Sequence, residues 1–439
     1  MTVLEASPDI DTARQQLVER YRRTRALSIE LCQPLEPEDY RIQSMTDVSP
    51  PWWNLGHTSW FFAKNILEPF GRYSDEDANL EYVLNSYYIA LGPRIARDHR
   101  GLVTRPTTDR IYRFRQSVDE RMEALIREVD EADFDTVRDY TLIGINHEQQ
   151  HQELLVTEFK HILGSNVRQL REPYGPAARP QAALVPTAEA IGFEGGLYDF
   201  GNLEGGWCWD NELGVHQAWL DDFALMNRLV TNREYAEFMQ DGGYSDSLLW
   251  LSNGWTAVDA EGWEAPLYWE RVDGRWHSWT LSGTRAVDPD EPVCHVSFYE
   301  ADAYARWKSN NDPEWRGART PTEREWEHAA RISGFPASVA NFLDTRALHP
   351  MPARGESGKL LQMAGDVWEW TVSHYEPYPG YEPFEGSIAE YNGKFMDNQR
   401  VLRGGSCATP ADHIRVGYRN FWPAGTRFQF TGIRLARLT

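Results

Sequence analysis

The sequence predicts an α+β protein with two different halves, a helical N-terminal domain and a loop-rich C-terminal domain. From Ile10 to about Leu163, apolar side chains recur at the helical period of about 3.6 residues. A connector rich in Pro and Ala follows, and beyond it short segments are separated by Gly, Asn, Asp and Pro. The 18 Trp residues are concentrated in the second half, where large side chains can hold an irregular backbone. We therefore expect domains at residues 1–165 and 191–439, joined by a linker over residues 166–190.

The helical half predicts a bundle of four helices with one long connection. Its periodic segments are Asp11–Cys32, Pro51–Leu67, Thr108–Val129 and Leu142–Leu163. Four such helices favour an up-and-down four-helix bundle in which residues 70–106 connect the second helix to the third. Connections of this length inside a domain are usually functional. In the C-terminal half we expect short helices at Thr231–Met239, Tyr299–Lys308 and Thr322–Ile332.

Composition and charge exclude several classes of protein. With 44 Lys plus Arg against 66 Asp plus Glu, the net charge of −22 disfavours a nucleic-acid partner. No apolar run reaches the length of about 18 residues that a membrane-spanning helix needs. The N-terminus lacks the basic start and apolar stretch of a signal peptide, and the four Cys residues show no C-x-x-C spacing. We expect a cytoplasmic monomer without a disulfide framework or a cysteine zinc site.

A histidine pair, His147 and His151, marks a candidate metal site. The two residues are four positions apart on a predicted helix and therefore share one face of it. The same face continues through Leu154, Leu155 and Ile162, which places both imidazoles on the buried side. Buried imidazoles need partners, and a divalent cation would satisfy both at once. The alternative is a pair of histidines hydrogen-bonded to neighbouring polar groups.

The same five residues also fit a metalloprotease motif. His147-Glu148-x-x-His151 matches the H-E-x-x-H signature, in which the Glu is the general base. The extended form of that motif is absent because Leu154 and Thr157 stand where it needs Gly and His. A zinc protease with another third ligand therefore remains a minor alternative.

A third histidine, His57, lies in an aromatic stretch, Pro51 to Phe62. Alone it would be read as a core histidine. Together with the pair it completes a three-histidine set, with no ligand pattern of Asp, Glu or Cys nearby. Such a set is compatible with zinc or with a non-haem iron that keeps open positions, and the residues do not decide between the two.

The C-terminal half contains motifs that resemble the formylglycine-generating-enzyme (sulfatase-modifying-factor) family. The resemblance spans Ile191 to Thr439. The motifs are residues 223–235 (FALMNRLVTNREY), 292–301 (PVCHVSFYEA), 319–327 (RTPTEREWE), 365–371 (GDVWEWT), 403–406 (RGGS) and 432–434 (GIR). This implies a loop-rich, C-type-lectin-like fold. Formylglycine-generating enzymes bind copper through a cysteine pair near the C-terminus, and no second cysteine follows Cys407 here, so that activity is not expected.

The N-terminal half, with His57 and the His147/His151 pair, resembles the DinB-like metal-binding bundle. The two modules in this order resemble the sulfoxide synthases of ergothioneine biosynthesis, the hercynine oxygenases. That resemblance implies that the three histidines bind non-haem Fe(II). It also implies that the enzyme uses O2 to join a thiol to C2 of the hercynine imidazole as a sulfoxide. We expect the iron site at the interface of the two domains.

The resemblance also assigns residues to hercynine. Gln150 matches a position that contacts this substrate, and Asn420 and Phe421 match positions that hold its betaine end. An aromatic face there would offer a cation–π contact of about 0.5–2 kcal/mol. We expect the hercynine pocket between the bundle and the C-terminal domain.

The thiol substrate is expected to be free cysteine. Family members that use gamma-glutamylcysteine carry an Asp and an Arg where Trp422 and Thr426 stand, although Arg427 is adjacent. Residues 85–88 (NSYY) and 92–94 (GPR) resemble the branch that uses cysteine. In that branch paired tyrosines near the iron, here Tyr87 and Tyr88, act in proton transfer. The loop arginines would bind the cysteine carboxylate, with Arg97 and Arg100 as first choices and Arg94 as a further candidate.

Two other functions compete with this assignment. A selenoneine synthase would use a selenosugar in place of the thiol, and the residues do not exclude it. A non-catalytic small-molecule-binding protein of the same fold would bind no iron. We treat His99, His161, His216 and His374 as non-functional.

Overall fold

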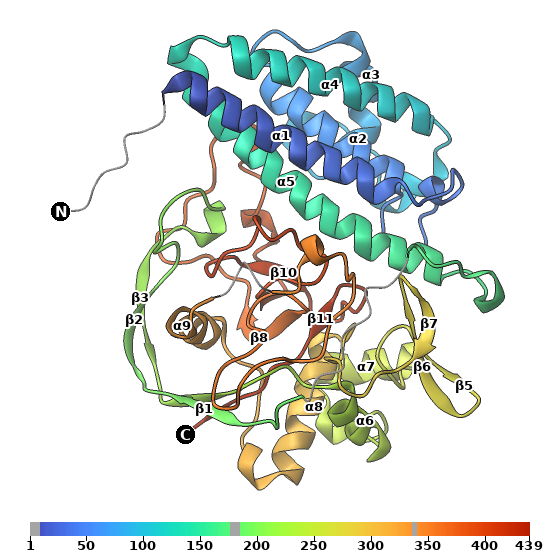
Figure 1. Ribbon diagram of the computed structural model, residues 1–439, viewed down its shortest axis with the longest axis vertical. Coiled ribbons are helices and arrows are strands. Elements are labelled where there is room, and N and C mark those ends of the chain that lie inside the picture. The colour runs from blue at the N-terminus through green and yellow to red at the C-terminus, as the bar shows by residue number, and fades with distance from the viewer. Residues whose placement is uncertain (1–8, 176–184, 336–339) are drawn as a thin grey trace. The chain divides into compact units, whose positions relative to one another are not determined.

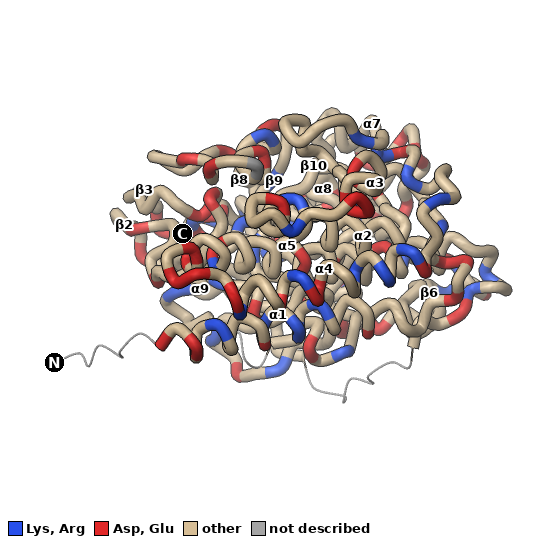
Figure 2. Tube along the Cα trace, turned by 90° about the horizontal axis from the view of Figure 1, so that it is seen from above, with Lys and Arg blue, Asp and Glu red and all other residues tan. Residues whose placement is uncertain are grey.

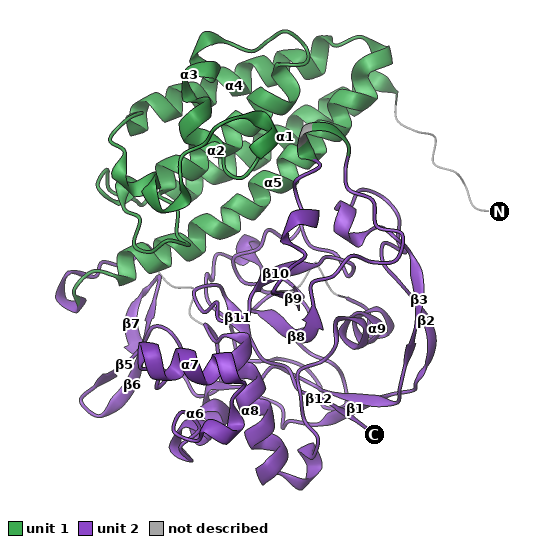
Figure 3. Cartoon of the chain, turned by 180° about the vertical axis from the view of Figure 1, so that it is seen from behind, with its two compact units in different colours: residues 1–167, 385–388 green, residues 168–384, 389–439 purple. Residues whose placement is uncertain are grey.

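The computed structural model describes residues 9–175, 185–335 and 340–439, which fold into two units (Figures 1 and 3). Unit 1 comprises residues 1–167 with 385–388, and unit 2 comprises residues 168–384 with 389–439. Unit 1 is helical, and unit 2 combines short strands with four helices among its described residues. The α+β fold class with a helical bundle first is therefore confirmed.

Unit 1 is built around four packed helices. The helices of the unit are α1 (Ile10–Cys32), α2 (Pro51–Phe62), α3 (Asp75–Leu84), α4 (Thr108–Glu128) and α5 (Glu131–Gly164). Helix α1 packs against α4 and α5, and α2 packs against the same two helices, which gives the expected bundle. Every residue of α2 is buried, as an apolar helix with no polar face requires.

Close packing of α2 and α5 depends on Gly144. A Cβ atom at this position would lie 2.3 Å from Cε1 of Phe62, so only a glycine lets the two helices approach at this point. The two helices carry all three candidate ligands, so their approach sets the geometry of the site.

Three expectations for the bundle are corrected by the structure. The connection over residues 70–106 is not a plain loop, because it contains α3 and the 3-10 turns Ile89–Leu91 and Arg97–Leu102. The histidine helix begins at Glu131 rather than Leu142, since its first turns are too polar to show a clear apolar stripe. Helix α2 ends at Phe62, and Ala63–Leu67 continues it as a π-turn.

Charged residues cover the outer faces of these helices. Acidic and basic residues are mixed along the chain of these helices (Figure 2). Several form ion pairs between helices or loops, among them Arg22 with Glu123 and Arg72 with Glu128. Such exposed pairs contribute little to stability, so the bundle depends on its apolar interior.

Unit 2 consists of small sheets joined by long irregular segments. A four-stranded sheet has the order β10-β9-β8-β11, and two three-stranded sheets have the orders β1-β4-β12 and β5-β6-β7. Strands β2 and β3 form a separate antiparallel pair. The strands are β1 (Ala190–Phe193), β2 (Gly196–Phe200), β3 (His216–Leu220), β4 (Phe223–Met226), β5 (Trp269–Val272), β6 (Arg275–Thr280), β7 (Gly283–Ala286), β8 (Trp368–His374), β9 (Gln399–Arg403), β10 (Asn420–Pro423), β11 (Thr431–Gly432) and β12 (Ala436–Leu438).

The helices of unit 2 are short. They are α6 (Asn232–Gln240), α7 (Ser252–Glu261), α8 (Phe298–Asn311) and α9 (Glu323–Ser333). Helices α6, α8 and α9 each begin with a Thr or Ser that caps the third residue of the helix, which is why they could be predicted. Helix α7 was not predicted, since Leu251 precedes it without a capping side chain and Gly254 lowers its helix propensity.

Large side chains and buried ion pairs hold the irregular backbone of unit 2. Fully buried tryptophans include Trp209, Trp279, Trp315, Trp326, Trp368 and Trp370. Buried guanidinium–carboxylate pairs join segments far apart in the chain, such as Arg434 with Glu369 at 2.7 Å. The expected role of the aromatic residues in this half agrees with this packing.

Candidate functional site

Three histidines from two helices converge in the interior of unit 1. His57 lies on α2, and His147 and His151 lie on α5. Each offers a ring nitrogen, and these atoms all lie within 4.8 Å of one another. Among the residues that the structure describes, this is the one group of three or more His, Cys, Asp or Glu side chains arranged to bind a metal ion. The predicted convergence of the three residues is therefore present in the structure.

Burial keeps all three imidazoles neutral. It lowers the pKa of His147 from 6.5 to about 3. It also holds the pKa of His57 and of His151 well below the ordinary value, and the neighbouring histidines lower them further. Neutral imidazole is the form that binds a metal, so the site is electrostatically ready for a cation without first losing protons.

The last turn of α3 orients His57. Nδ1 of His57 donates to the carbonyl oxygen of Leu84 at 2.6 Å, and Nε1 of Trp53 donates to that of Val83 at 2.8 Å. These carbonyls are available because the last carbonyls of a helix have no partner within it. With Nδ1 occupied, the second nitrogen of His57, Nε2, is buried without a hydrogen-bond partner among the described residues. An unsatisfied buried acceptor in a group of three imidazoles fits a bound metal ion.

A stacked column fixes the ring plane of the same histidine. Trp53 and His57, four residues apart on α2, stack with centroids 4.5 Å apart and planes 11° apart. The guanidinium of Arg100 lies 3.4 Å over the Trp53 ring. The Trp53 ring is therefore fixed by Arg100 over its face and by the hydrogen bond of its Nε1 atom. His57 cannot rotate without displacing the Trp53 ring.

The second ligand on α5 has its own hydrogen-bond partner. Nδ1 of His151 lies 2.7 Å from Oδ1 of Asn54, and Nδ2 of Asn54 donates to Oε2 of Glu158 at 2.6 Å. Partners of this kind set which ring nitrogen faces the metal. For both His57 and His151, Nε2 is the nitrogen left to face a metal ion.

Glu148 is not placed to act as a protease base. Its Oε2 atom accepts from Nη1 of Arg25 at 2.8 Å, and its Oε1 atom accepts from Oγ of Ser28 at 2.6 Å and from Nη2 of Arg115. Both oxygens are thus used in a buried ion-pair network that ties α5 to α1 and α4. The H-E-x-x-H match is a coincidence of spacing, and the zinc protease alternative loses its general base.

The paired tyrosines lie one aromatic layer away from the histidines. The rings of Tyr87 and Tyr88 stack with centroids 4.6 Å apart, and their hydroxyl oxygens are 3.5 Å apart. The buried Tyr88 ring lies 6.0 Å from that of Trp60 and 6.2 Å from that of Phe61. Phe61 in turn lies 4.4 Å from the ring of His147.

The loop arginines differ in accessibility. Arg94 and Arg97 are exposed, whereas Arg100 is buried. Nη1 and Nη2 of Arg100 donate to the hydroxyls of Ser49 and Ser86 at 2.9 and 3.1 Å. Arg100 is therefore already held by neutral hydroxyls, while the two other guanidiniums reach the surface of the unit.

In unit 2, Asn420 and Phe421 begin strand β10, which pairs with β9. The Phe421 ring stacks on that of Tyr375, with centroids 4.1 Å apart and planes 12° apart. Oδ1 of Asn420 accepts from the backbone N–H of Phe421 at 2.8 Å, and both residues are partly buried. Neighbouring residues of a strand point to opposite faces, so their side chains diverge.

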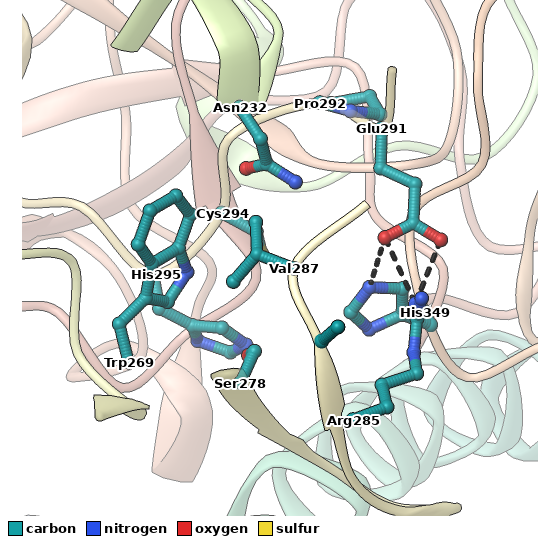
Figure 4. A pocket seen from close by; sticks show the side chains of 11 residues that line it. Asn232, Trp269, Ser278, Arg285, Val287, Glu291, Pro292, Cys294, His295 and His349 are labelled. Carbon is teal, nitrogen blue, oxygen red and sulfur yellow. Dashed lines mark hydrogen bonds and ion pairs between the residues drawn. The ribbon is translucent and has the colours of Figure 1, made fainter. Parts of the chain in front are cut away.

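Unit 2 also contains a small internal cavity (Figure 4). Its volume is about 10 Å³, which accommodates at most one water molecule. Glu291 points into it and binds both Arg285, at 2.7 Å, and Nε2 of His349, at 3.1 Å. The cavity is too small for a substrate, and the ion pairs explain its polar side chains as structural.

Comparison with known proteins identifies the family of each half and of the whole chain. Residues 176–439 match the sulfatase-modifying factor enzyme 1-like domain, and residues 20–155 match the DinB superfamily. The hercynine oxygenase of Mycolicibacterium smegmatis is 35% identical in an alignment of 318 positions that covers 66% of this chain and 70% of that protein. The hercynine oxygenase of Mycolicibacterium thermoresistibile is 30% identical in an alignment of 466 positions that covers 99% of this chain and 96% of that protein. The chain belongs to the hercynine oxygenase family.

Membership of the hercynine oxygenase family confirms the resemblance drawn from the sequence motifs. Ergothioneine biosynthesis protein 1 of Schizosaccharomyces pombe is a more distant relative, 26% identical over 52% of this chain and 27% of its own length. No described helix of the chain combines the length and the apolar character needed to cross a bilayer.

For a hercynine oxygenase, the partners of the histidines are the part of the site that sequence reasoning missed. Asn54, Glu158, the Leu84 carbonyl and the Trp53–Arg100 stack were not predicted. A signal existed for two of them. Asn54 lies one helical turn before His57, and Glu158 lies two turns after His151, so each is a polar residue on the buried face that carries a ligand.

Proposed function

We propose that the chain is an O2-dependent sulfoxide synthase that joins the sulfur of cysteine to C2 of the hercynine imidazole. The observation that carries the proposal is the group of three buried, neutral imidazoles within 4.8 Å, in a chain that aligns with a hercynine oxygenase over 99% of its length. Oxygen-dependent chemistry of this kind needs a metal with vacant coordination positions. A site of three neutral ligands meets that requirement.

We propose ferrous iron as the metal of this site, bound by Nε2 of His57 and His151 and by His147. Three neutral ligands leave a divalent iron its full positive charge and leave positions for the substrates and O2. When bound, the iron would supply the activation of O2 and of the thiol. The role of the protein is then to hold three imidazoles neutral, to orient them and to exclude water around them.

For hercynine, the proposed contacts are Gln150, Asn420 and Phe421. The trimethylammonium group of this substrate is a cation without hydrogen-bond donors, so an aromatic face is a suitable partner. Stacking on Tyr375 holds the Phe421 ring in one orientation, which lowers the entropy cost of such a contact. Gln150 and Asn420 supply amide groups suited to the polar ends of hercynine.

For the thiol, we propose free cysteine, with its carboxylate bound by arginines of the loop over residues 85–105. Arg94 and Arg97 are exposed, and Nη2 of Arg97 donates to the Asp47 carbonyl at 2.8 Å, whereas Arg100 would add charge from its place on Trp53. Arg427, the residue nearest to the position expected to bind a gamma-glutamyl arm, is paired with Glu300 at 2.8 and 3.0 Å. It is therefore not available for that role.

Tyr87 and Tyr88 are the proposed proton donors of the reaction. Their stacked rings and neighbouring hydroxyls place two phenols beside the aromatic layer that covers His147. We also propose that the enzyme acts in the cytoplasm and that it is a monomer. Light scattering of the purified protein would test the oligomeric state.

The test is reconstitution under controlled atmosphere. Purified protein is loaded with Fe(II) without oxygen, mixed with hercynine and cysteine, and then exposed to O2. Mass spectrometry should detect a product equal to hercynine plus cysteine plus one oxygen atom, with two hydrogens fewer. The product should be absent without O2, without Fe(II) or with Zn(II) in its place.

Parallel reactions with gamma-glutamylcysteine decide the thiol. A higher kcat/KM for cysteine is expected, and a preference for gamma-glutamylcysteine would overturn the cysteine assignment while leaving the reaction type intact. Failure to form either product, in a protein that binds iron, would overturn the proposed function.

A further inference from the structure

Two of the candidate ligands are oriented by hydrogen bonds of different character. His57 donates from Nδ1 to a backbone carbonyl, Leu84 O, which can only accept. His151 faces the side-chain amide of Asn54, 2.7 Å away. An amide can present either its oxygen or its NH2 group, so Asn54 alone does not determine which nitrogen of His151 carries the proton.

Glu158 resolves this ambiguity by its position. Its Oε1 atom accepts the backbone N–H of Ser49 at 2.8 Å, and its Oε2 atom accepts Nδ2 of Asn54 at 2.6 Å. When Glu158 is ionised, both of its oxygens can only accept, so the NH2 group of Asn54 must face Glu158 and its oxygen must face His151. Nδ1 of His151 is then the donor, and Nε2 carries the lone pair.

We infer that Glu158 is a positioning residue that acts through Asn54 to set the tautomer of His151, so that Nε2 is free to bind the metal. The inference rests on the proposed metal site. The three side chains form one buried chain, with Asn54 and Glu158 each 1% exposed and His151 9% exposed. Water therefore does not compete for these hydrogen bonds.

A buried carboxylate at this position is otherwise unfavourable. Burial raises the pKa of Glu158 to about 8, against the opposing effects of the Ser49 N–H, Arg97, Asn54 and Arg100. A divalent metal ion bound at Nε2 of His151 would favour the ionised form of Glu158, because its positive charge attracts negative charge along the hydrogen-bonded chain. Control of the His151 tautomer gives a function to Glu158, whose ionised form is disfavoured by burial.

The Ser49 N–H makes one substitution especially informative. In Glu158→Gln, the new amide oxygen must face the Ser49 N–H, so its NH2 group faces Asn54. Asn54 would then turn its oxygen to that NH2 group and present its own NH2 group to His151. His151 would accept at Nδ1, place its proton on Nε2 and lose its metal-binding lone pair.

A second substitution should restore the arrangement. In the double variant Asn54→Asp/Glu158→Gln, the introduced carboxylate accepts from both His151 Nδ1–H and the introduced amide. The chain of donors and acceptors is then complete again with the charge moved by one residue. Thr157→Val is the matched control, because Thr157 is buried beside Glu158 on α5 and its hydroxyl donates to the Leu154 carbonyl.

Two measurements test the inference. Long-range ¹⁵N–¹H spectra of metal-free protein with ¹⁵N-labelled histidine report the His151 tautomer, and they are recorded above the pKa of Glu158, which is about 8. The His151 signal is assigned by its loss in His151→Asn. Titration with Co(II), followed by its visible absorption, reports metal affinity. Wild type and Thr157→Val should show the Nδ1–H tautomer and equal affinity. Glu158→Gln should shift His151 toward Nε2–H and weaken Co(II) binding about 10–100-fold. The double variant should recover most of both.

The outcomes separate this inference from the proposed function. An Nε2–H tautomer of His151 in the wild-type apoprotein, above the pKa of Glu158, would overturn the inference even if Glu158→Gln failed to fold. So would Co(II) binding by a folded Glu158→Gln variant within about threefold of wild type, or a double variant no better than the single one. A wild-type protein with the Nδ1–H tautomer that binds no Co(II) would contradict the proposed metal site instead.

Discussion

The carbonyl oxygen of Leu84 and Nδ1 of His57 are joined by a hydrogen bond of 2.6 Å inside the bundle. This contact links the end of α3 to a candidate metal ligand on α2. Since a carbonyl only accepts, the proton of His57 stays on Nδ1. Its Nε2 atom is then the nitrogen that it offers to the group formed with His147 and His151. A short helix in the connection between two bundle helices is thereby part of the site.

The first prediction concerns the three ligands themselves. His57→Ala should reduce the iron content of the purified protein to near zero and abolish product formation, because two imidazoles leave a divalent ion weakly held. His161→Ala is the control, since His161 lies on the same helix as the pair but bonds to Ser44 at 2.6 Å. Elemental analysis and turnover are the measurements. A His57→Ala protein that is iron-replete and fully active would refute the ligand assignment.

The depressed pKa values of the histidines lead to a prediction about pH. Burial, together with neighbouring charges, holds the pKa of His57 and His151 well below 6.5, and burial lowers that of His147 to about 3. All three therefore stay neutral as the pH falls from 7.5 to 5.5. With an ordinary pKa of about 6.5, protonation at pH 5.5 would lower the contribution of each histidine to metal affinity about tenfold. Three such histidines together would lower the affinity by about 10³. Co(II) affinity should instead change by less than about tenfold.

That pH series has its own control. A chelator of known proton affinity in the same titration corrects for changes in free Co(II). A loss of affinity near 10³ between pH 7.5 and 5.5 would mean that the imidazoles of the free protein are accessible to water, against the burial seen here.

The sequence predicted the three candidate ligands but not the groups that orient them, and the reason is physical. His147 and His151 can be recognised from the sequence because a fixed helical spacing puts both on one face. His57 required the aromatic context and the family resemblance. The Leu84 carbonyl is a backbone atom, available only because α3 ends there, and the sequence interpretation assigned no helix to that segment. Asn54 and Glu158 are ordinary polar residues until tertiary packing brings α2 against α5.

In the fold, too, features set by local sequence were predicted and features set by distant contacts were not. Helices with a capping side chain and an apolar stripe were predicted to within a few residues, as α1 and α9 illustrate. Helix α7, which has no such cap, was missed. In unit 2 the sheet order depends on pairings between distant segments, such as β4 with β12, and local sequence carries no information about these.

The buried network around Glu148 predicts a large loss of stability on mutation. Burial opposes ionisation of Glu148, but Arg115 and Arg25 outweigh it and hold its pKa below the ordinary value of 4.5. Glu148→Gln would leave two buried guanidiniums without their countercharge and should cost about 3–5 kcal/mol in the free energy of unfolding. Urea denaturation at pH 7 measures this, with Glu131→Gln at the exposed start of α5 as the control.

The sign of the pH dependence is fixed by the same shift. Because the folded pKa is depressed, ionised Glu148 stabilises the fold above the unfolded value of about 4.5, and this contribution is lost as the pH falls through the folded value. The stability difference between wild type and Glu148→Gln should therefore shrink as the pH falls below 4.5. A difference that is small at pH 7 would show that the network is not coupled to folding.

Gly144 provides a test of the scaffold apart from its polar groups. In Gly144→Ala the new methyl carbon would lie 2.3 Å from the Phe62 ring, so α2 and α5 must separate or Phe62 must leave its position. We expect a destabilisation of about 1–3 kcal/mol, with weaker Co(II) binding because the two helices carry the three ligands. Gly192→Ala is the control, since a Cβ atom there meets nothing within 4 Å. Equal stability and metal affinity in both variants would contradict the close approach of α2 and α5.

The last prediction separates the roles of the two tyrosines from those of packing residues. Tyr88 is fully buried against Trp60 and Phe61, while Tyr87 is partly exposed and stacks on it. Removing a hydroxyl keeps both rings and hence the packing, so Tyr87→Phe and Tyr88→Phe should fold and bind iron as wild type does. If either phenol donates a proton, its loss should lower sulfoxide formation by about 10²–10⁴-fold and divert cysteine to its own oxidation, with the two products quantified by mass spectrometry. Phe61→Leu, which disturbs the same aromatic layer without removing a hydroxyl, is the control and should lower both products together. Wild-type product ratios in both tyrosine variants would leave the two phenols a packing role alone.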